Sequence, residues 1–167
     1  MKKVAAFIFL IFFLFINCSA LAQEPLQASV SIEDRLPPEF FGSWEVLSIQ
    51  TSCSNPLLSA PVSIDFWNLS RAKNVITLNN PQTGAIASVK IDEVQGNTVK
   101  FTRTSTSDTE IVTETPTITI NGENFVGTDK IIVKNYKFGQ HISTDVWIYT
   151  LKAKKISGAS TQSIFKK

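Results

Sequence analysis

The chain has 167 residues, of which 16 are Lys or Arg and 14 are Asp or Glu, with a single His and two Cys. This length suits one globular domain, and the nearly balanced charge excludes a basic nucleic-acid-binding protein. Two Cys are too few for a small domain that is held together by several disulfides.

Residues 1–22 have the pattern of a secretory signal peptide. A Lys pair precedes an apolar run over residues 4–16, and Ala20-Leu21-Ala22 offers small residues for cleavage. Cleavage would remove both leader lysines and leave 14 basic against 14 acidic side chains. We therefore expect an exported protein, periplasmic or secreted, with no transmembrane segment in the mature chain. Lipid anchoring at Cys18 is the alternative.

The remaining chain divides into three parts. Residues 23–39 contain three prolines and no helical periodicity, and we expect them to form an extended N-terminal arm. Residues 40–159 form a single β-domain, and residues 160–167 form a polar, basic tail.

Within the domain, apolar and polar residues alternate with a period of two, and short turn signals separate the runs. The expected strands lie at 44–49, 62–67, 75–78, 87–91, 99–103, 117–120, 123–126, 130–136 and 146–151. A further edge segment at 111–114 is expected to stop at Pro116, because proline cannot donate to a strand ladder. Asn121-Gly122 predicts a hairpin with a type I′ turn.

These runs predict an all-β domain of about eight or nine strands without a helix. Short connections favour an antiparallel up-and-down β-barrel, because closing a sheet on itself removes its exposed edges. A two-sheet β-sandwich is the alternative fold.

Gly42-Ser43-Trp44 stands at the head of the first expected strand. It resembles the G-x-W signature of lipocalins and the related calycin proteins. The segment Thr144-Asp145-Val146-Trp147-Ile148-Tyr149 is similar to the T-D-Y-x-x-Y pattern of lipocalins, with Val146 in place of the first Tyr. The resemblance implies a lipocalin-like barrel and carries no ligand identity.

In lipocalins the Trp closes the bottom of an eight-stranded barrel, and a basic side chain from a late strand packs over its ring. The resemblance implies that Gly42 and Trp44 close the barrel as structural residues. The basic side chain would be one of Lys152, Lys154 and Lys155. One calycin branch, the small periplasmic protease inhibitors, inserts an N-terminal arm into a protease cleft, which makes residues 23–41 an alternative site of function.

Inward-facing side chains of such a barrel would line a cavity for a small apolar ligand. Strand alternation makes the candidates Phe66, Val89, Ile91, Phe101, Arg103, Phe125, Val133 and Tyr149, with Trp44, Val46 and Ile148 as further interior residues. Arg103 shares a strand face with Val99 and Phe101. Turned inward, it would need a partner or an anionic ligand, whereas at a strand end it would reach solvent.

Other polar residues give no catalytic pattern. His141 is the only His, and Cys53 would be the only Cys after cleavage, so we expect no metal site and no cofactor. We interpret Glu110 and Glu114 as a solvated acid pair. The absence of G-x-S-x-G and of any convergent acid and base argues against an enzyme.

The sequence therefore predicts an exported, non-enzymatic, lipocalin-like protein that binds a small hydrophobic ligand. A protease inhibitor that acts through its arm is one alternative. The other is a structural protein of the cell envelope without a ligand.

Overall fold

The computed structural model of the chain describes residues 31–58 and 60–157. The expected signal peptide (1–22) with Cys18, the first part of the expected arm (23–30) and the expected tail (160–167) lie outside these residues.

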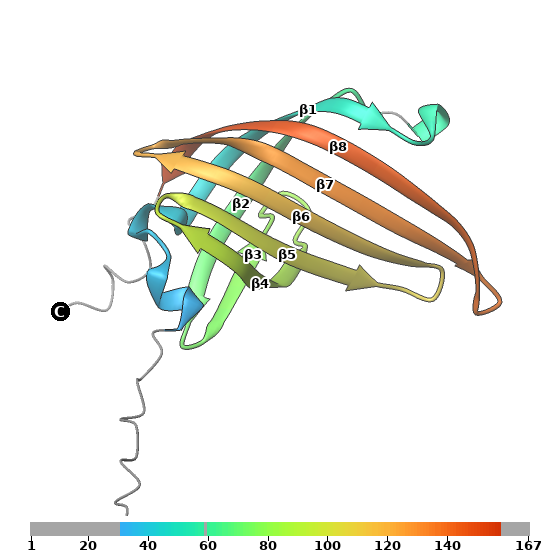
Figure 1. Cartoon of the computed structure of the whole chain (residues 1–167), viewed down its shortest axis with the longest axis horizontal. Coiled ribbons are helices and arrows are strands. Elements are labelled where there is room, and N and C mark those ends of the chain that lie inside the picture. The colour runs from blue at the N-terminus through green and yellow to red at the C-terminus, as the bar shows by residue number, and fades with distance from the viewer. Residues whose placement is uncertain (1–30, 59, 158–167) are drawn as a thin grey trace, which may run out of the picture.

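Eight antiparallel strands form one sheet that closes on itself (Figure 1). Each strand pairs with the next in the chain, and β1 also pairs with β8. The strands are β1 (Gly42–Cys53), β2 (Val62–Ala72), β3 (Val75–Asn79), β4 (Ile86–Gln95), β5 (Thr98–Thr106), β6 (Glu110–Asn121), β7 (Asn124–Lys137) and β8 (Gln140–Ser157). The predicted all-β antiparallel fold is confirmed, with the strands in one ring and not in two separate sheets.

Pro116 lies inside β6, so the predicted stop at this residue is wrong. Beside it the β5–β6 ladder is interrupted: it passes from Lys100↔Thr117 to Arg103↔Glu114. Proline has no N–H to give to a ladder, and this local interruption lets the strand continue through it. The two segments predicted on either side of Pro116 are therefore one strand.

The β6–β7 connection is the hairpin predicted at Asn121-Gly122. Asn121 pairs with Asn124, so Gly122 and Glu123 are the central residues of the turn. Gly122 has a positive φ of 59°, and Glu123 does not. A type I′ turn requires a positive φ at both positions, whereas type II′ requires it only at the first. The hairpin is confirmed, and its predicted turn type is wrong.

One end of the barrel is closed by a cluster of buried aromatic side chains. We call it the aromatic plug, and it consists of Phe40, Phe41, Trp44, Trp67, Phe101 and Phe125. Trp44 Nε1 donates to the carbonyl oxygen of Phe40 at 3.3 Å. Lys155 Nζ lies 4.9 Å from the centroid of the Trp44 ring and donates to the carbonyl oxygen of Glu39 at 2.9 Å. Of the three lysines named as candidates for the basic side chain over the Trp44 ring, Lys155 is the one that lies there.

The described part of the expected arm lies against the plugged end of the barrel (Figure 1). It forms two short 3-10 helices, η1 (Ile32–Arg35) and η2 (Pro38–Phe40), and a third, η3 (Pro56–Leu58), lies between β1 and β2. Arg71 Nη2 contacts Asp34 Oδ1 at 2.8 Å. Leu36 is buried in the core. These contacts hold residues 31–39 on the barrel, where the sequence predicts an extended arm.

Strand alternation on β2 differs by one residue from the expected phase, and on β8 only one of two expected interior residues is inside. Trp67 is buried, and Phe66 is half-buried on the opposite face. Of the two β8 residues expected inside, Tyr149 is buried and Ile148 is exposed. Both faces of these strands carry apolar residues, so the pattern does not show which face is inside. The interior position expected for Phe66 belongs to Trp67 instead.

Candidate functional site

The inner face of the sheet changes from aromatic to polar along the strands that form the plug. Successive inward positions on a strand are two residues apart. Several inward side chains beyond the aromatic plug are polar. Ser48 and Asp129 lie four residues after Trp44 and Phe125, and Asp65 and Arg103 lie two residues from Trp67 and Phe101. Polar groups from distant parts of the sequence are therefore collected beyond one apolar floor.

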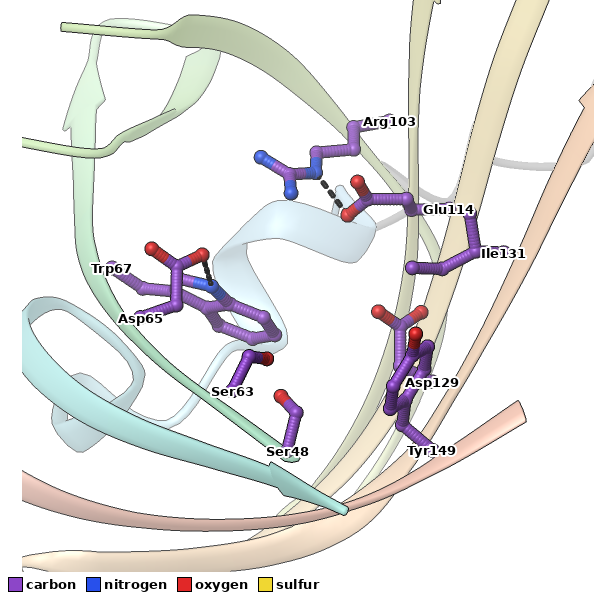
Figure 2. A pocket seen from close by; sticks show the side chains of 9 residues that line it. All are labelled: Ser48, Ser63, Asp65, Trp67, Arg103, Glu114, Asp129, Ile131 and Tyr149. Atoms are coloured by element: carbon purple, nitrogen blue, oxygen red, sulfur yellow. Dashed lines mark hydrogen bonds and ion pairs between the residues drawn. The ribbon is translucent and has the colours of Figure 1, made fainter. Parts of the chain in front are cut away.

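These side chains surround a cavity of about 140 Å³ inside the barrel (Figure 2). Strands β1 and β2 contribute Ser48, Ser63, Asp65 and Trp67, and strands β5 to β8 contribute Arg103, Glu114, Asp129, Ile131 and Tyr149. Ile131 is the one lining side chain without a polar atom. The cavity is thus mainly polar.

Arg103 and Glu114 form an ion pair at the outer side of this cavity. They lie opposite each other in the β5–β6 ladder, and Arg103 Nε donates to Glu114 Oε2. Their side chains are 20% and 15% exposed. Of the two orientations considered for Arg103, inward with a partner or outward to solvent, the structure has the inward one, and the partner is Glu114. The interpretation of Glu114 as a solvated surface acid was wrong, because its strand turns it into the barrel.

Asp129 is the most isolated polar group of the cavity. It is 4% exposed, and its Oδ1 has no hydrogen-bond partner among the described residues. Burial, and next the negative charge of Glu114, raise the pKa of this carboxyl to about 7. Arg103 and the N–H groups of Thr115 and Lys130 act in the opposite direction. Asp129 is therefore a buried acceptor with an unfilled place for a donor.

Asp65, on the opposite wall of the cavity, is fully engaged. It accepts hydrogen bonds from the N–H of Phe66 at 2.8 Å, from Trp67 Nε1 at 3.1 Å and from Asn80 Nδ2. Asn80 Oδ1 in turn accepts from the N–H of Gln82 at 2.8 Å, inside the β3–β4 turn. Asp65 thus fixes the Trp67 ring and anchors this turn.

Tyr149 is buried beside Asp129 on the neighbouring strand. The two residues face each other in the β7–β8 ladder, and both side chains line the cavity. Burial, and next the nearby Cys53 and Asp129, raise the pKa of the Tyr149 hydroxyl. Tyr149 therefore remains a neutral hydrogen-bonding group at ordinary pH.

A second hollow of about 240 Å³ adjoins the first one. Arg103 and Glu114 line both of them. Its other lining residues are Ala85, Ile86, Ala87, Thr104, Ser105 and Val112. The ion pair thus stands at the boundary between a polar cavity and a more apolar hollow.

The structure brings only Arg103 and Tyr149 of the expected cavity residues to these spaces. Four others, Val89, Ile91, Phe101 and Phe125, are buried in the packed core. Phe66 and Val133 are half-buried and line neither of the two spaces.

The sequence reasoning missed several lining residues, namely Ser48, Ser63, Asp65, Trp67, Glu114, Asp129 and Ile131. The available signal was Arg103, which shares a face with the buried Val99 and Phe101. An inward Arg requires an acid on a neighbouring strand, and Glu114 lies on the next expected segment.

Other chemistry-bearing residues lie elsewhere. His141 is exposed, with Nε2 2.9 Å from Thr144 Oγ1. Cys53 is half-buried, and its Sγ donates to the carbonyl oxygen of Asn55 at 3.0 Å. Across the described part of the chain, no three His, Cys, Asp or Glu side chains are grouped so that they could hold a metal ion.

Residues 31–58 and 60–157 contain no helix with the length and apolar character needed to cross a membrane. Comparisons of the chain with protein-family models, with curated proteins and with solved structures found no match.

Proposed function

We propose that this chain is an exported, lipocalin-like binding protein whose barrel holds a small ligand through a protonated amine. The observation that carries the proposal is the buried, unpartnered Oδ1 of Asp129 inside a cavity. A buried carboxylate oxygen without a donor is unfavourable, and a ligand ammonium group would supply both the donor for Oδ1 and the opposite charge.

The charges of the cavity favour a cation. Asp65, Glu114 and Asp129 oppose a single guanidinium, that of Arg103. The Arg103 charge is paired with Glu114, and Asp65 already receives its donors. The charge that remains without a partner is therefore the negative charge of Asp129.

The size of the cavity limits the part of the ligand that it encloses. About 140 Å³ is similar to the roughly 150 Å³ of an engineered protein cavity that binds benzene. Trp67 and Tyr149 also present aromatic rings to this space, and such rings attract ammonium groups. A short primary amine fits these conditions better than a wholly apolar ligand.

The lipocalin-like part of the proposal rests on the barrel end. Gly42-Ser43-Trp44 begins β1, and Lys155 from the last strand lies over the Trp44 ring. This is the arrangement that the resemblance implies. The export part rests on the pattern of residues 1–22.

The protease-inhibitor alternative has less support than ligand binding. It needs residues 23–41 to enter a protease cleft, yet residues 31–41 pack on their own barrel. Phe40 and Phe41 in particular are fully buried. Withdrawing them would open the plugged end of the barrel.

The binding test is calorimetric titration of the protein, expressed without residues 1–22, with n-butylamine at a pH above 7. Butanol and butyrate of the same chain length serve as uncharged and anionic comparisons. We expect saturable binding of the amine alone, which also changes the fluorescence of Trp67. In Asp129→Asn the amine should bind at least about tenfold more weakly, since a charge-assisted hydrogen bond is lost.

The matched control is Asp108→Asn, which makes the same chemical change at an exposed loop carboxylate. This variant should bind the amine like the wild type. Equal binding of butanol and the amine, or an unchanged affinity in Asp129→Asn, would contradict the proposal. Absence of binding by all three probes would favour a structural role without a ligand.

A further inference from the structure

We infer that the ligand is an amphiphilic amine, whose ammonium group pairs with Asp129 and whose apolar part lies in the hollow between β4, β5 and β6. This inference rests on the proposed function, and it adds the second half of the ligand and the direction in which it lies.

The hollow lies where the pairing between β4 and β5 ends, towards the open end of the barrel. The β4–β5 ladder ends with the pair Lys90↔Thr102. The β3–β4 ladder continues beyond this level to Asn79↔Ile86. The first part of β4, residues 86–89, therefore pairs with β3 and not with β5, and a space remains between it and the part of β5 that begins at Arg103.

The residues around this space suit a hydrocarbon chain. Ala85, Ile86, Ala87 and Val112 supply apolar groups, and Thr104 and Ser105 are small and uncharged. The only charged lining residues are Arg103 and Glu114, which neutralise each other. An apolar chain would therefore leave no buried charge without a partner.

The strand register gives the order of the two binding regions. Asp129 lies opposite Pro116 on β6, and Glu114 is the next inward position towards the open end. Val112 is the next one after that, and it lines the second hollow. A ligand with its ammonium at Asp129 therefore extends past the ion pair into the hollow. Figure 2 shows Asp129, Glu114 and Arg103 directed into the first cavity, and Arg103 and Glu114 also line the second hollow.

The test is a series of n-alkylamines from ethylamine to octylamine, titrated into the wild-type protein. Once the chain passes the ion pair, each added methylene should tighten binding by up to about fourfold, the value for a fully buried CH₂ group, since Ile86 and other lining residues are partly open to solvent. The gain should cease when the hollow is filled.

Variants locate the apolar chain. Ile86→Thr combined with Val112→Thr makes two hollow residues polar; the size is kept at Val112, and Ile86 loses one heavy atom. Affinity for ethylamine should stay as in the wild type, and the gain per methylene should fall. Ile64→Thr is the matched control, because Ile64 is exposed on the outer face of β2. It should leave the whole series unchanged.

The outcomes separate the two claims. If ethylamine binds in a way that depends on Asp129 but affinity does not rise with chain length, the inference is wrong and the proposed function stands. The same holds if affinity rises equally in the wild type and in the double variant, because the chain then lies elsewhere. If no amine binds, the proposed function itself fails.

Discussion

Asp129 is the residue of the cavity on which the proposed binding depends. Its cross-strand neighbour on β6 is Pro116, which has no N–H, and its Oδ1 receives no donor in the described part of the chain. Burial, and next the negative charge of Glu114, raise its pKa to about 7, so this group is partly protonated at neutral pH. Burying this carboxyl without a donor for Oδ1 lowers the free energy of unfolding, and a ligand that donates to Oδ1 would raise it again.

Replacement of this residue should change how stability depends on pH. The folded-state pKa is above the unfolded value, so the folded chain keeps a proton that the unfolded chain loses between pH 3.8 and about 7. The free energy of unfolding therefore falls as pH rises through this window, by on the order of 4 kcal/mol. Asp129→Asn should lack this decline, as measured by urea unfolding at a series of pH values.

The control for this prediction is again Asp108→Asn, which should keep the decline of the wild type. Parallel pH curves for the wild type and Asp129→Asn would show that the carboxyl titrates normally in the folded protein.

At the scale of single residues, the sequence could predict part of the site. Arg103 was identified because a cation on an apolar strand face needs a partner, and Tyr149 because it lies on a long late strand. Asp129 could not be found in this way, because its neighbours Thr128 and Lys130 are polar as well. Only the register from Phe125, four residues earlier, turns it inward.

Among the elements, β6 and β7 approach each other unusually closely at Gly127. A Cβ atom at this position would lie 2.2 Å from the carbonyl oxygen of Thr117 and 2.9 Å from Cα of Ile118. Both are backbone atoms, which cannot move aside like a flexible side chain. Glycine is therefore required here by space and not by its φ angle.

Gly127→Ala should consequently destabilise the protein by about 1 to 3 kcal/mol, the usual range for overpacking. Urea unfolding of the purified variant measures the loss. Gly122→Asn is the control: its turn position has φ 59° and open space around it, and Asn tolerates this conformation. Equal stability of Gly127→Ala and the wild type would show that the two strands can separate at no cost.

Strand boundaries and the inward face of a strand could not all be predicted from the sequence pattern. Alternation located all eight strands, but it divided β6 at Pro116, divided β7 between Val126 and Lys130, and shortened β8. The pattern is a local property, whereas the continuity of β6 depends on a gap in its ladder with β5. The face of β2 was equally ambiguous, because Phe66 and Trp67 are both aromatic and only the closed ring decides between them.

In the whole molecule, the aromatic plug and the polar cavity divide the interior of one barrel. The plug packs the interior at one end, and the same strands carry polar groups into the space beyond it. The resemblance at Gly42-Ser43-Trp44 implied that Trp44 closes the barrel, but Phe101 and Phe125 of the plug were expected to line the cavity. The sequence could not predict that the cavity is polar, because the four carboxylate and guanidinium groups come from β2, β5, β6 and β7 and meet only when the sheet closes.

The central claim is that a ligand ammonium group pairs with Asp129 inside the barrel. The most direct test is an NMR titration of the Asp129 side-chain carboxyl carbon with and without saturating n-butylamine. We expect a pKa of about 7 for this carboxyl in the free protein. The amine should lower this pKa by about 1 to 3, as an adjacent opposite charge does. A pKa near 3.8 in the free protein, or a raised pKa that the amine leaves unchanged, would contradict it.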